Sequence, residues 1–276
     1  MTITTAHITD YASYLHGEER AAATIAKYAR DIRAFAVYLG GSPVTKESAI
    51  AYKAQISGTH APASVNSMLA AINGFFAYHS VGVKIKPVKT QRRAFLSAER
   101  ELTRPEYLRL LAAAKSKENE RLNLVMQTIC STGIRVSELR FFTVAAAKSG
   151  VAEVTNKGKT RTVFIPERLT AALLRYCKKR GICSGCIFIS RNGKPLDRSN
   201  IWAAMKKLCD DAGIAHSKVF PHSLRALFAR TFYAVDKDIA KLADILGHSS
   251  IDTTRGYVKE NSGEHRRRIE ILRLVT

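Results

Sequence analysis

The chain has no run of apolar residues close to the ~18 that a membrane-spanning helix requires. Its first residues, Met1–Thr5, show neither the basic start nor the apolar core of a secretory signal. Only five cysteines occur in 276 residues, and this small, odd number fits reduced thiols better than a disulfide framework. These absences predict a cytoplasmic protein rather than a membrane or secreted one.

Spacings typical of metal sites are also missing. Cys177, Cys183 and Cys186 follow the pattern C-x5-C-x2-C, which does not match the paired C-x2-C knuckles of zinc sites. Small buried or surface thiols are the better interpretation. We therefore expect no metal and no other cofactor.

Acidic residues are scarce, because 23 Asp and Glu face 44 Lys and Arg, which gives a formal net charge of +21. A polyanionic partner is the simplest explanation, and a merely soluble basic protein is the alternative. No basic helix with a broad apolar face stands out, so binding to a membrane surface is not expected. The hydrophobic fraction of 46% argues for a folded chain, and its length favours two domains.

Residues 1–80 are predicted to form a helical domain. One amphipathic stripe ends at Gly40 and consists of Ile25, Tyr28, Ile32, Phe35 and Leu39. A second stripe runs from Val65 to Phe76 and ends near His79. The polar residues that flank this second stripe face either a groove or solvent; they are Ser64, Ser67 and Asn73.

Residues 81–100 interrupt the helical pattern and are predicted to be a basic linker between two domains. Its cations are Lys84, Lys86, Lys89, Arg92 and Arg93. Such a segment could follow a DNA backbone and add affinity that depends on salt but not on sequence. A solvated tether is the alternative.

Residues 101–276 are predicted to form a second domain. Its first helix has Thr103 as N-cap and Glu106 three residues later. The β-branched residues on both sides of Asn156–Lys159 predict a β-hairpin with a cationic tip, and Ile187–Ile189 predicts a short further strand. More helices are expected around 199–208, from Pro221 onward, around 237–246 and around Tyr257. The fold class is therefore mainly α with a small β-sheet (α+β).

Four short motifs in this second domain carry reactive side chains. They are Thr132–Leu139 with Arg135, Asn156–Lys159 with Lys157, Pro221–Arg225 with His222 and Arg225, and Leu246–Tyr257 with His248 and Tyr257. Arginine suits a phosphodiester because its planar fork donates two hydrogen bonds to phosphate oxygens and keeps its charge. A phenol, with a pKa of ~10, needs such charge nearby and a histidine to accept its proton. The motifs thus suit attack on a phosphodiester by Tyr257.

His222 and Arg225 are three residues apart, so a helix from Pro221 places them on one face. We expect that face to point away from the core. The opposite, buried side is expected to consist of Leu224, Leu227, Phe228 and Thr231. Lys159 and Arg161, on the hairpin, are predicted to contact phosphates.

In this order, the four motifs resemble those of the tyrosine recombinases of the phage-integrase and Xer type. The resemblance implies that Arg135 and Arg225 bind the scissile phosphate, and that Lys157 protonates the leaving 5′-oxygen. It implies that His222 assists proton transfer and that His248 hydrogen-bonds the phosphate. Tyr257 would form a 3′-phosphotyrosyl bond. Glu138 is similar to the acidic residue that orients the site in this family.

The resemblance also implies an architecture and partners. Residues 1–80 would be a core-binding domain and 101–276 a catalytic domain with a C-terminal tail, closing as a clamp around double-stranded DNA with paired inverted-repeat sites. The protein would be a monomer or dimer when free and a homo-tetramer on DNA, exchanging strands through a Holliday junction. Accessory proteins are possible partners, and no metal is needed.

The residues after Tyr257 depart from the family pattern, because they lack the His-Pro ending of housekeeping Xer proteins. This difference favours a mobile-element integrase or DNA invertase, with Xer-type resolution of chromosome dimers as the alternative. In the tail, Ile269, Leu272 and Val275 could form a stripe that docks on a neighbouring protomer, or on their own domain.

Other classes explain the sequence less well. A type IB topoisomerase shares the cleavage half-reaction but needs no paired sites, and a non-catalytic DNA-binding member would not need an intact set of motifs. Relaxases use a tyrosine with a metal-binding histidine cluster, and the eight histidines include no His-x-His pair. An RNA-binding protein would account for the charge but not for the motifs.

Overall fold

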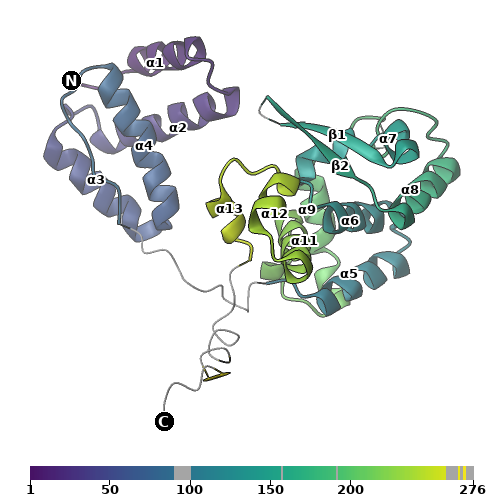
Figure 1. Cartoon of the computed structure of the whole chain (residues 1–276). Coiled ribbons are helices and arrows are strands. Elements are labelled where there is room, and N and C mark those ends of the chain that lie inside the picture. Colours follow the sequence, from purple (N-terminus) through teal and green to yellow (C-terminus); the bar gives the residue numbers. More distant parts are fainter. Residues whose placement is uncertain (90–100, 157, 191, 259–266, 268–269, 272–276) are drawn as a thin grey trace. The chain divides into compact units, whose positions relative to one another are not determined.

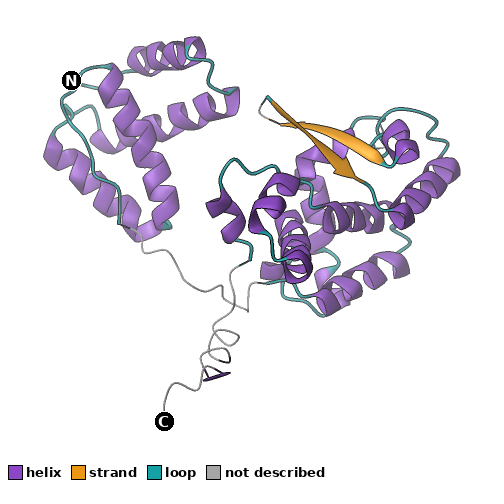
Figure 2. Ribbon diagram, in the orientation of Figure 1, coloured by secondary structure: helices purple, strands orange, loops and turns teal. Residues whose placement is uncertain are grey.

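The structure of the chain is a computed structural model that describes residues 1–89, 101–156, 158–190, 192–258, 267, 270 and 271. The chain divides into two compact units, Met1–Arg92 and Arg93–Thr276, which are described separately below (Figure 1). Among the described residues, regular strands occur only as one two-stranded sheet, and helices make up the rest of the regular structure (Figure 2). The predicted fold class is therefore confirmed.

The first unit is helical. Its helices are α1 Thr5–Gly17, α2 Ala22–Leu39, α3 Lys46–Thr59 and α4 Pro62–Tyr78. As predicted, Gly40 terminates α2: it follows the last helical residue, Leu39, and adopts the left-handed conformation with φ 56°. The two predicted apolar stripes meet in the core, where Phe35 and Phe75 are fully buried.

Residues 81–89, predicted to belong to the linker, pack instead on the first unit. The side chain of Asn73 accepts a hydrogen bond from the Ile85 amide at 2.9 Å and donates one to the Ile85 carbonyl at 2.9 Å. Asn66 makes the same pair of bonds with Val88, at 2.7 and 3.0 Å. Ile85 is only 1% exposed. Asn73 thus satisfies the hydrogen-bonding groups of the Ile85 backbone rather than facing a groove or solvent.

The second unit contains most of the elements. They are α5 Arg104–Ser116, α6 Glu120–Thr132, the 3-10 helix η2 Val136–Phe141, α7 Val144–Ser149, β1 Val151–Asn156, β2 Lys159–Phe164, α8 Glu167–Arg180, α9 Arg198–Lys206, α10 Cys209–Ala212, the 3-10 helix η3 His216–Lys218, α11 Pro221–Asp236, α12 Ile239–Leu246 and α13 Ile251–Arg255. The capping box predicted at Thr103 and Glu106 opens α5. The predicted hairpin is present, because β1 and β2 are antiparallel and Asn156 pairs with Lys159.

Helix α11 packs closely against α6 through a glycine at the end of α6. Gly133 has φ +66°, and a Cβ atom there would lie 2.4 Å from Phe228 of α11 and 3.0 Å from Leu246. Only glycine allows this approach without strain. It brings the start of η2, with Arg135, close to the helix that carries His222 and Arg225.

Three local predictions are wrong or incomplete. Ile187–Ile189 forms no regular strand, since Ile189 makes only an isolated bridge with Pro195. On α11, His222 is exposed and Leu224 and Leu227 are buried as predicted, but Thr231 is exposed and Arg225 is buried, contrary to the prediction. Tyr257 lies in the turn that follows α13 rather than inside that helix.

None of the helices in the described ranges is both long and apolar enough to cross a membrane. Over the same ranges, no group of three or more His, Cys, Asp or Glu side chains is placed to hold a metal ion. Ile269, Leu272 and Val275 of the tail lie outside the described residues.

Candidate active site

The second unit brings five of the six predicted catalytic residues into one group. Arg135 stands at the start of η2, and α11 supplies both His222 and Arg225. His248 follows α12, and Tyr257 follows α13. The sixth residue, Lys157, lies outside the described residues, between the two strands of the hairpin.

Arg225 is 1% exposed and its guanidinium is held from several directions. It donates to the carbonyl of Gly133 at 2.5 Å and to that of Leu246 at 2.6 Å. The Nη2 atom that donates to Leu246 also lies 2.9 Å from Nε2 of His248. These bonds use three of the five N–H donors that a guanidinium has. Nε, one of the two left over, is buried and has no partner among the described residues.

Burial, followed by the charge of Arg135, lowers the pKa of Arg225 to about 10. Arg225 therefore stays cationic at neutral pH. A buried cation with N–H groups to spare is costly unless an anion completes its surroundings. The arrangement suits a phosphate.

His248 is held between Arg225 and Thr254. Because a guanidinium can only donate, Nε2 of His248 must accept from Arg225, and Nδ1 must therefore carry the ring proton. Nδ1 lies 2.8 Å from Oγ1 of Thr254, which is fully buried. Burial and the charges of Arg225 and Arg135 lower the pKa of His248 to about 4. The ring is thus neutral at pH 7, with a single tautomer fitting its partners.

Tyr257 is 8% exposed, and its Oη lies 3.0 Å from Nε2 of His222. Its ring also stacks on His248, with centroids 5.4 Å apart and planes only 4° from parallel. Burial lowers the pKa of His222, and the charges of Arg225 and Arg135 lower it further. A neutral His222 can accept a proton through Nε2, so the pair has the geometry of a nucleophile and its general base.

Arg135 is held by Glu138, which is 1% exposed. Glu138 accepts from the backbone amide of Arg135 at 2.8 Å and from its Nη1 at 3.0 Å. Nη2 of Arg135 reaches the Gly247 carbonyl at 3.3 Å. The segment Leu246–His248 thus contacts Arg135 through Gly247 and Arg225 through the residues on either side of it.

Arg161 completes this network from β2. Its Nη1 and Nη2 bind the two carboxylate oxygens of Glu138 at 3.1 and 2.7 Å, and its Nε donates to the Ile245 carbonyl at 3.1 Å. Burial by itself would raise the pKa of Glu138, but the hydrogen bonds from Arg161 and Arg135 outweigh it and hold that pKa at about 2. Glu138 is therefore a carboxylate throughout the physiological range.

The predicted DNA contacts fall into three groups. Arg161 was predicted to contact phosphates, but the structure places its side chain, 14% exposed, on Glu138. Lys159, Lys84, Lys86 and Lys89 are exposed. Arg92 and Arg93 lie outside the described residues.

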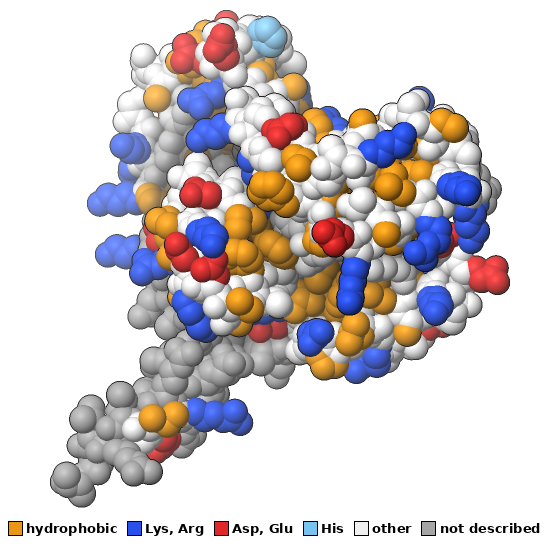
Figure 3. Space-filling view, turned by 45° about the vertical axis from the view of Figure 1, so that its right-hand side comes forward, with side chains coloured by type: hydrophobic (Ala, Val, Ile, Leu, Met, Phe, Trp, Pro, Cys, Tyr) orange, Lys and Arg blue, Asp and Glu red, His pale blue; other side chains and the backbone are white. Residues whose placement is uncertain are grey.

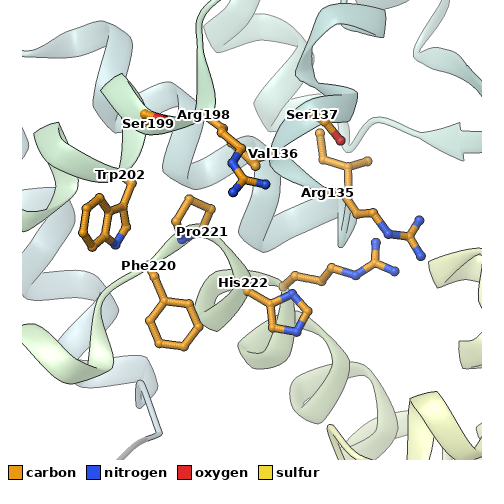
Figure 4. Close-up of a pocket in the computed structure, with 11 residues that line it drawn as sticks. Arg135, Val136, Ser137, Arg198, Ser199, Trp202, Phe220, Pro221 and His222 are labelled. Carbon is orange, nitrogen blue, oxygen red and sulfur yellow. The ribbon is translucent and has the colours of Figure 1, made fainter. Parts of the chain in front are cut away.

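Sequence reasoning missed residues around this group. Thr254 is one, and only its position inside the last motif could have pointed to it. The others line a cavity of about 620 Å³ beside Arg135, His222 and Arg225. Among them are Arg198 and Trp202 of α9 and Phe220, all shown in Figure 4.

The chain belongs to the phage integrase family, whose family model matches residues 100–264. It is therefore a tyrosine-type site-specific DNA recombinase, an enzyme that cleaves and rejoins DNA strands. The family resemblance read from the motifs is confirmed.

The chain is similar to "Tyrosine recombinase XerA" of Thermococcus onnurineus (strain NA1), with 28% identity over 97% of this chain and 95% of the relative. Its fold is similar to XerH recombinase bound to a palindromic difH substrate, with a TM-score of 0.74 and 18% identity over 90% of this chain and 79% of that one. It is also similar to a lambda integrase tetramer bound to a Holliday junction, with a TM-score of 0.73 and 21% identity over 91% and 76% of the two chains.

Proposed function

We propose that this recombinase cleaves duplex DNA through a 3′-phosphotyrosyl bond to Tyr257 and exchanges strands through a Holliday junction. The observation that carries the proposal is the 3.0 Å contact between Oη of Tyr257 and Nε2 of His222, beside a buried Arg225 with N–H groups to spare. A phenol becomes a nucleophile only where a base takes its proton and cations stabilise the phosphate.

In the proposed step, Oη attacks phosphorus while the bond from phosphorus to the 5′-oxygen breaks. The phenolic proton passes to Nε2 of His222. Arg225 and Arg135 donate to the non-bridging oxygens and stabilise the charge that develops there. The leaving 5′-oxygen takes a proton from Lys157, an assignment that rests on the family resemblance alone. The phosphotyrosyl bond conserves the energy of the broken linkage, so rejoining needs no nucleotide cofactor.

For His248 we propose a role that differs from the one implied by the resemblance. Its Nε2 is occupied as an acceptor from Arg225 at 2.9 Å, so it has no proton to offer a phosphate oxygen in this state. His248 would act by fixing the orientation of the Arg225 guanidinium. Glu138, bound by both Arg135 and Arg161, would do the same for Arg135.

The proposed substrate is double-stranded DNA with paired inverted-repeat sites, bound by a homo-tetramer. The palindromic difH substrate of XerH and the Holliday junction bound by the lambda integrase tetramer support this assembly. Lys and Arg side chains are spread over the visible face of the molecule in Figure 3. Exposed Lys84, Lys86, Lys89 and Lys159 are proposed to contact the backbone, with Arg92 and Arg93 added from the sequence.

Two biological roles fit this chemistry. Residues 258–276 contain no His-Pro pair, which favours a mobile-element integrase or invertase. The similarity to XerA over nearly the whole chain favours Xer-type resolution of chromosome dimers. The position of the target sites in the genome decides between them, because resolution needs one chromosomal site and an element carries sites at its ends.

Covalent trapping tests the proposal. Wild-type protein and the Tyr257→Phe variant would be incubated with fragmented genomic DNA, denatured, and the attached DNA ends sequenced. We expect attachment by the wild type alone, at a locus with inverted repeats. Tyr233→Phe is a matched control, since Tyr233 of α11 packs against the same apolar cluster as Tyr257, and its hydroxyl makes no hydrogen bond with any residue that the structure describes. Attachment by Tyr257→Phe would overturn the assignment of the nucleophile.

A further inference from the structure

A cavity continues from the proposed phosphate site toward α9. Its volume is about 620 Å³, and Arg135, His222 and Arg225 form one part of its wall. In Figure 4, Trp202, Phe220 and Pro221 lie together on the other side. None of the residues on that far side has a role in the proposed chemistry.

Among the described residues, Arg198 is the cation of this cavity whose side chain has no protein partner. Arg135 and Arg225, which also line the cavity, donate to carboxylate or carbonyl oxygens. Arg198 is exposed, and its guanidinium makes no hydrogen bond or ion pair with any residue that the structure describes. Its guanidinium points into the cavity in Figure 4, on the side toward Arg135. A guanidinium with all its donors available is well suited to an anion such as a second phosphate.

The aromatic part of the wall is formed by Trp202 and Phe220. Trp202 follows Arg198 by four residues on α9, so both side chains lie on the same face of that helix. It is 49% exposed, and Nζ of Lys206 lies 5.5 Å from its ring. Large aromatic side chains beside cations supply apolar contact area next to a phosphate group.

We propose that this cavity is a subsite for the nucleotide next to the scissile phosphodiester, in which Arg198 binds the adjoining backbone phosphate and Trp202 and Phe220 pack against its deoxyribose. The proposal rests on the proposed function, because it takes the arginine pair as the site of the scissile phosphate. Phosphates follow one another every 3.4 Å of axis along a strand, so a second phosphate is always close to the first. The subsite would fix the register of the strand over Tyr257.

Arg198 would then act as a substrate-binding residue whose loss slows cleavage by misplacing the scissile phosphate. We expect Arg198→Ala to reduce the rate of covalent attachment by about 10- to 100-fold, the range associated with small misplacements of a reacting group. Arg168→Ala is the matched control, since Arg168 is an exposed arginine of α8, away from this cavity.

The decisive experiment removes the charge of one phosphate at a time. The DNA site recovered by trapping would be made as a nicked duplex, with an uncharged methylphosphonate replacing the linkage on either side of the scissile one. We expect one of these two replacements to slow the wild type about as much as Arg198→Ala does, and to slow Arg198→Ala no further. The subsite would be overturned if Arg198→Ala formed the covalent bond as fast as the wild type. It would also be overturned if each methylphosphonate replacement slowed Arg198→Ala by the same factor as it slows the wild type.

A second readout is independent of cleavage. Trp202 is the only tryptophan of the chain, so its fluorescence reports on this cavity alone. We expect the emission of the Tyr257→Phe variant to change as the duplex binds, in step with binding measured by anisotropy of labelled DNA. Binding without any change in emission would contradict the subsite.

The two proposals fail in different ways. If the wild type forms no covalent bond with DNA, the proposed function fails, and the Trp202 titration with genomic fragments still decides whether DNA enters the cavity. If the wild type and Arg198→Ala cleave DNA at equal rates, only the subsite fails.

Discussion

The Thr254 hydroxyl lies 2.8 Å from Nδ1 of His248 and determines which nitrogen of that ring faces Arg225. With Nδ1 protonated, Nε2 is a free acceptor for the guanidinium, 2.9 Å away. The backbone carbonyl of Thr254 also accepts from the Tyr257 amide at 2.9 Å. One buried residue therefore connects the nucleophile with the arginine that is proposed to bind its target.

Replacing Thr254 should affect cleavage through His248. In Thr254→Val the Nδ1–H group loses its acceptor, a cost of about 1–3 kcal/mol for a buried donor, and the ring loses the contact that holds its Nε2 against Arg225. We expect covalent attachment to slow roughly tenfold, whereas Thr254→Ser, which keeps a hydroxyl, stays near the wild-type rate. Nitrogen NMR of His248 should show a protonated Nδ1 in both proteins, and its proton should exchange faster with water in Thr254→Val. Thr253→Val, at the exposed neighbouring position, should change neither measurement.

Cleavage should depend on pH through His222. Only neutral His222 can accept the phenolic proton, so protonation removes activity. Burial and the charges of Arg225 and Arg135 lower its pKa below the usual 6.5. The second-order rate constant for attachment, which reports on the free enzyme, should therefore stay level from pH 8 to about 6.5 and fall below that. An inflection above pH 7 would speak against a neutral His222 in the free protein.

Arg161 and Lys159 should behave differently although both were predicted to contact phosphates. Arg161→Ala leaves the buried Glu138 carboxylate without one of its two cationic partners, and breaking a buried ion pair typically lowers the free energy of unfolding by about 3–5 kcal/mol. We expect a lower melting temperature and slower cleavage, with Arg161→Lys failing to restore the bidentate contact.

The salt dependence of DNA binding separates these two residues. Each lost phosphate contact reduces the slope of log affinity against log salt by about 0.9. Lys159→Ala should lower that slope and leave the melting temperature unchanged. Arg161→Ala should leave the slope unchanged and lower the melting temperature. A reduced salt slope for Arg161→Ala would instead show that Arg161 contacts a phosphate.

Gly133 should tolerate no side chain. A Cβ atom there meets Phe228 at 2.4 Å and Leu246 at 3.0 Å, whereas the same atom at Gly150, also at positive φ, meets nothing within 4 Å. Both Gly133→Ala and Gly150→Ala carry the strain of the left-handed backbone, and only the first adds overpacking, of about 1–3 kcal/mol. Denaturant unfolding should show this extra loss for Gly133→Ala. Equal losses would mean that α6 and α11 adjust their packing.

The sequence was sufficient for much of the fold and for the identity of the reactive residues. Helices such as α2 and α11 have clear start and stop signals, and the β-branched residues around Asn156–Lys159 mark the hairpin. Periodicity could not indicate that Arg225 is buried, because its partners are the carbonyls of Gly133 and Leu246, distant in the chain. The same holds for Arg161 and Glu138, since charge alone does not distinguish a phosphate contact from an internal ion pair.

Asn66 and Asn73 illustrate a further limit. A polar residue beside an apolar helical stripe looks like a solvent-facing one, although here both amides bind the backbone of residues 81–89. Ile187–Ile189 was predicted as a strand from its β-branched composition. Composition cannot tell a strand from an isolated bridge, because that depends on which neighbour is available for pairing.

The burial of Arg225 affects how active and inactive relatives of this chain can be distinguished by sequence. Because it donates to the carbonyls of two separate segments, its loss would leave both acceptors unsatisfied, and selection for a stable fold alone would preserve it. A descendant that no longer cut DNA would thus be expected to keep this arginine while its phenol drifted to other residues. Tyr257, rather than Arg225, is the position at which an active and a decayed copy of such a gene would be told apart.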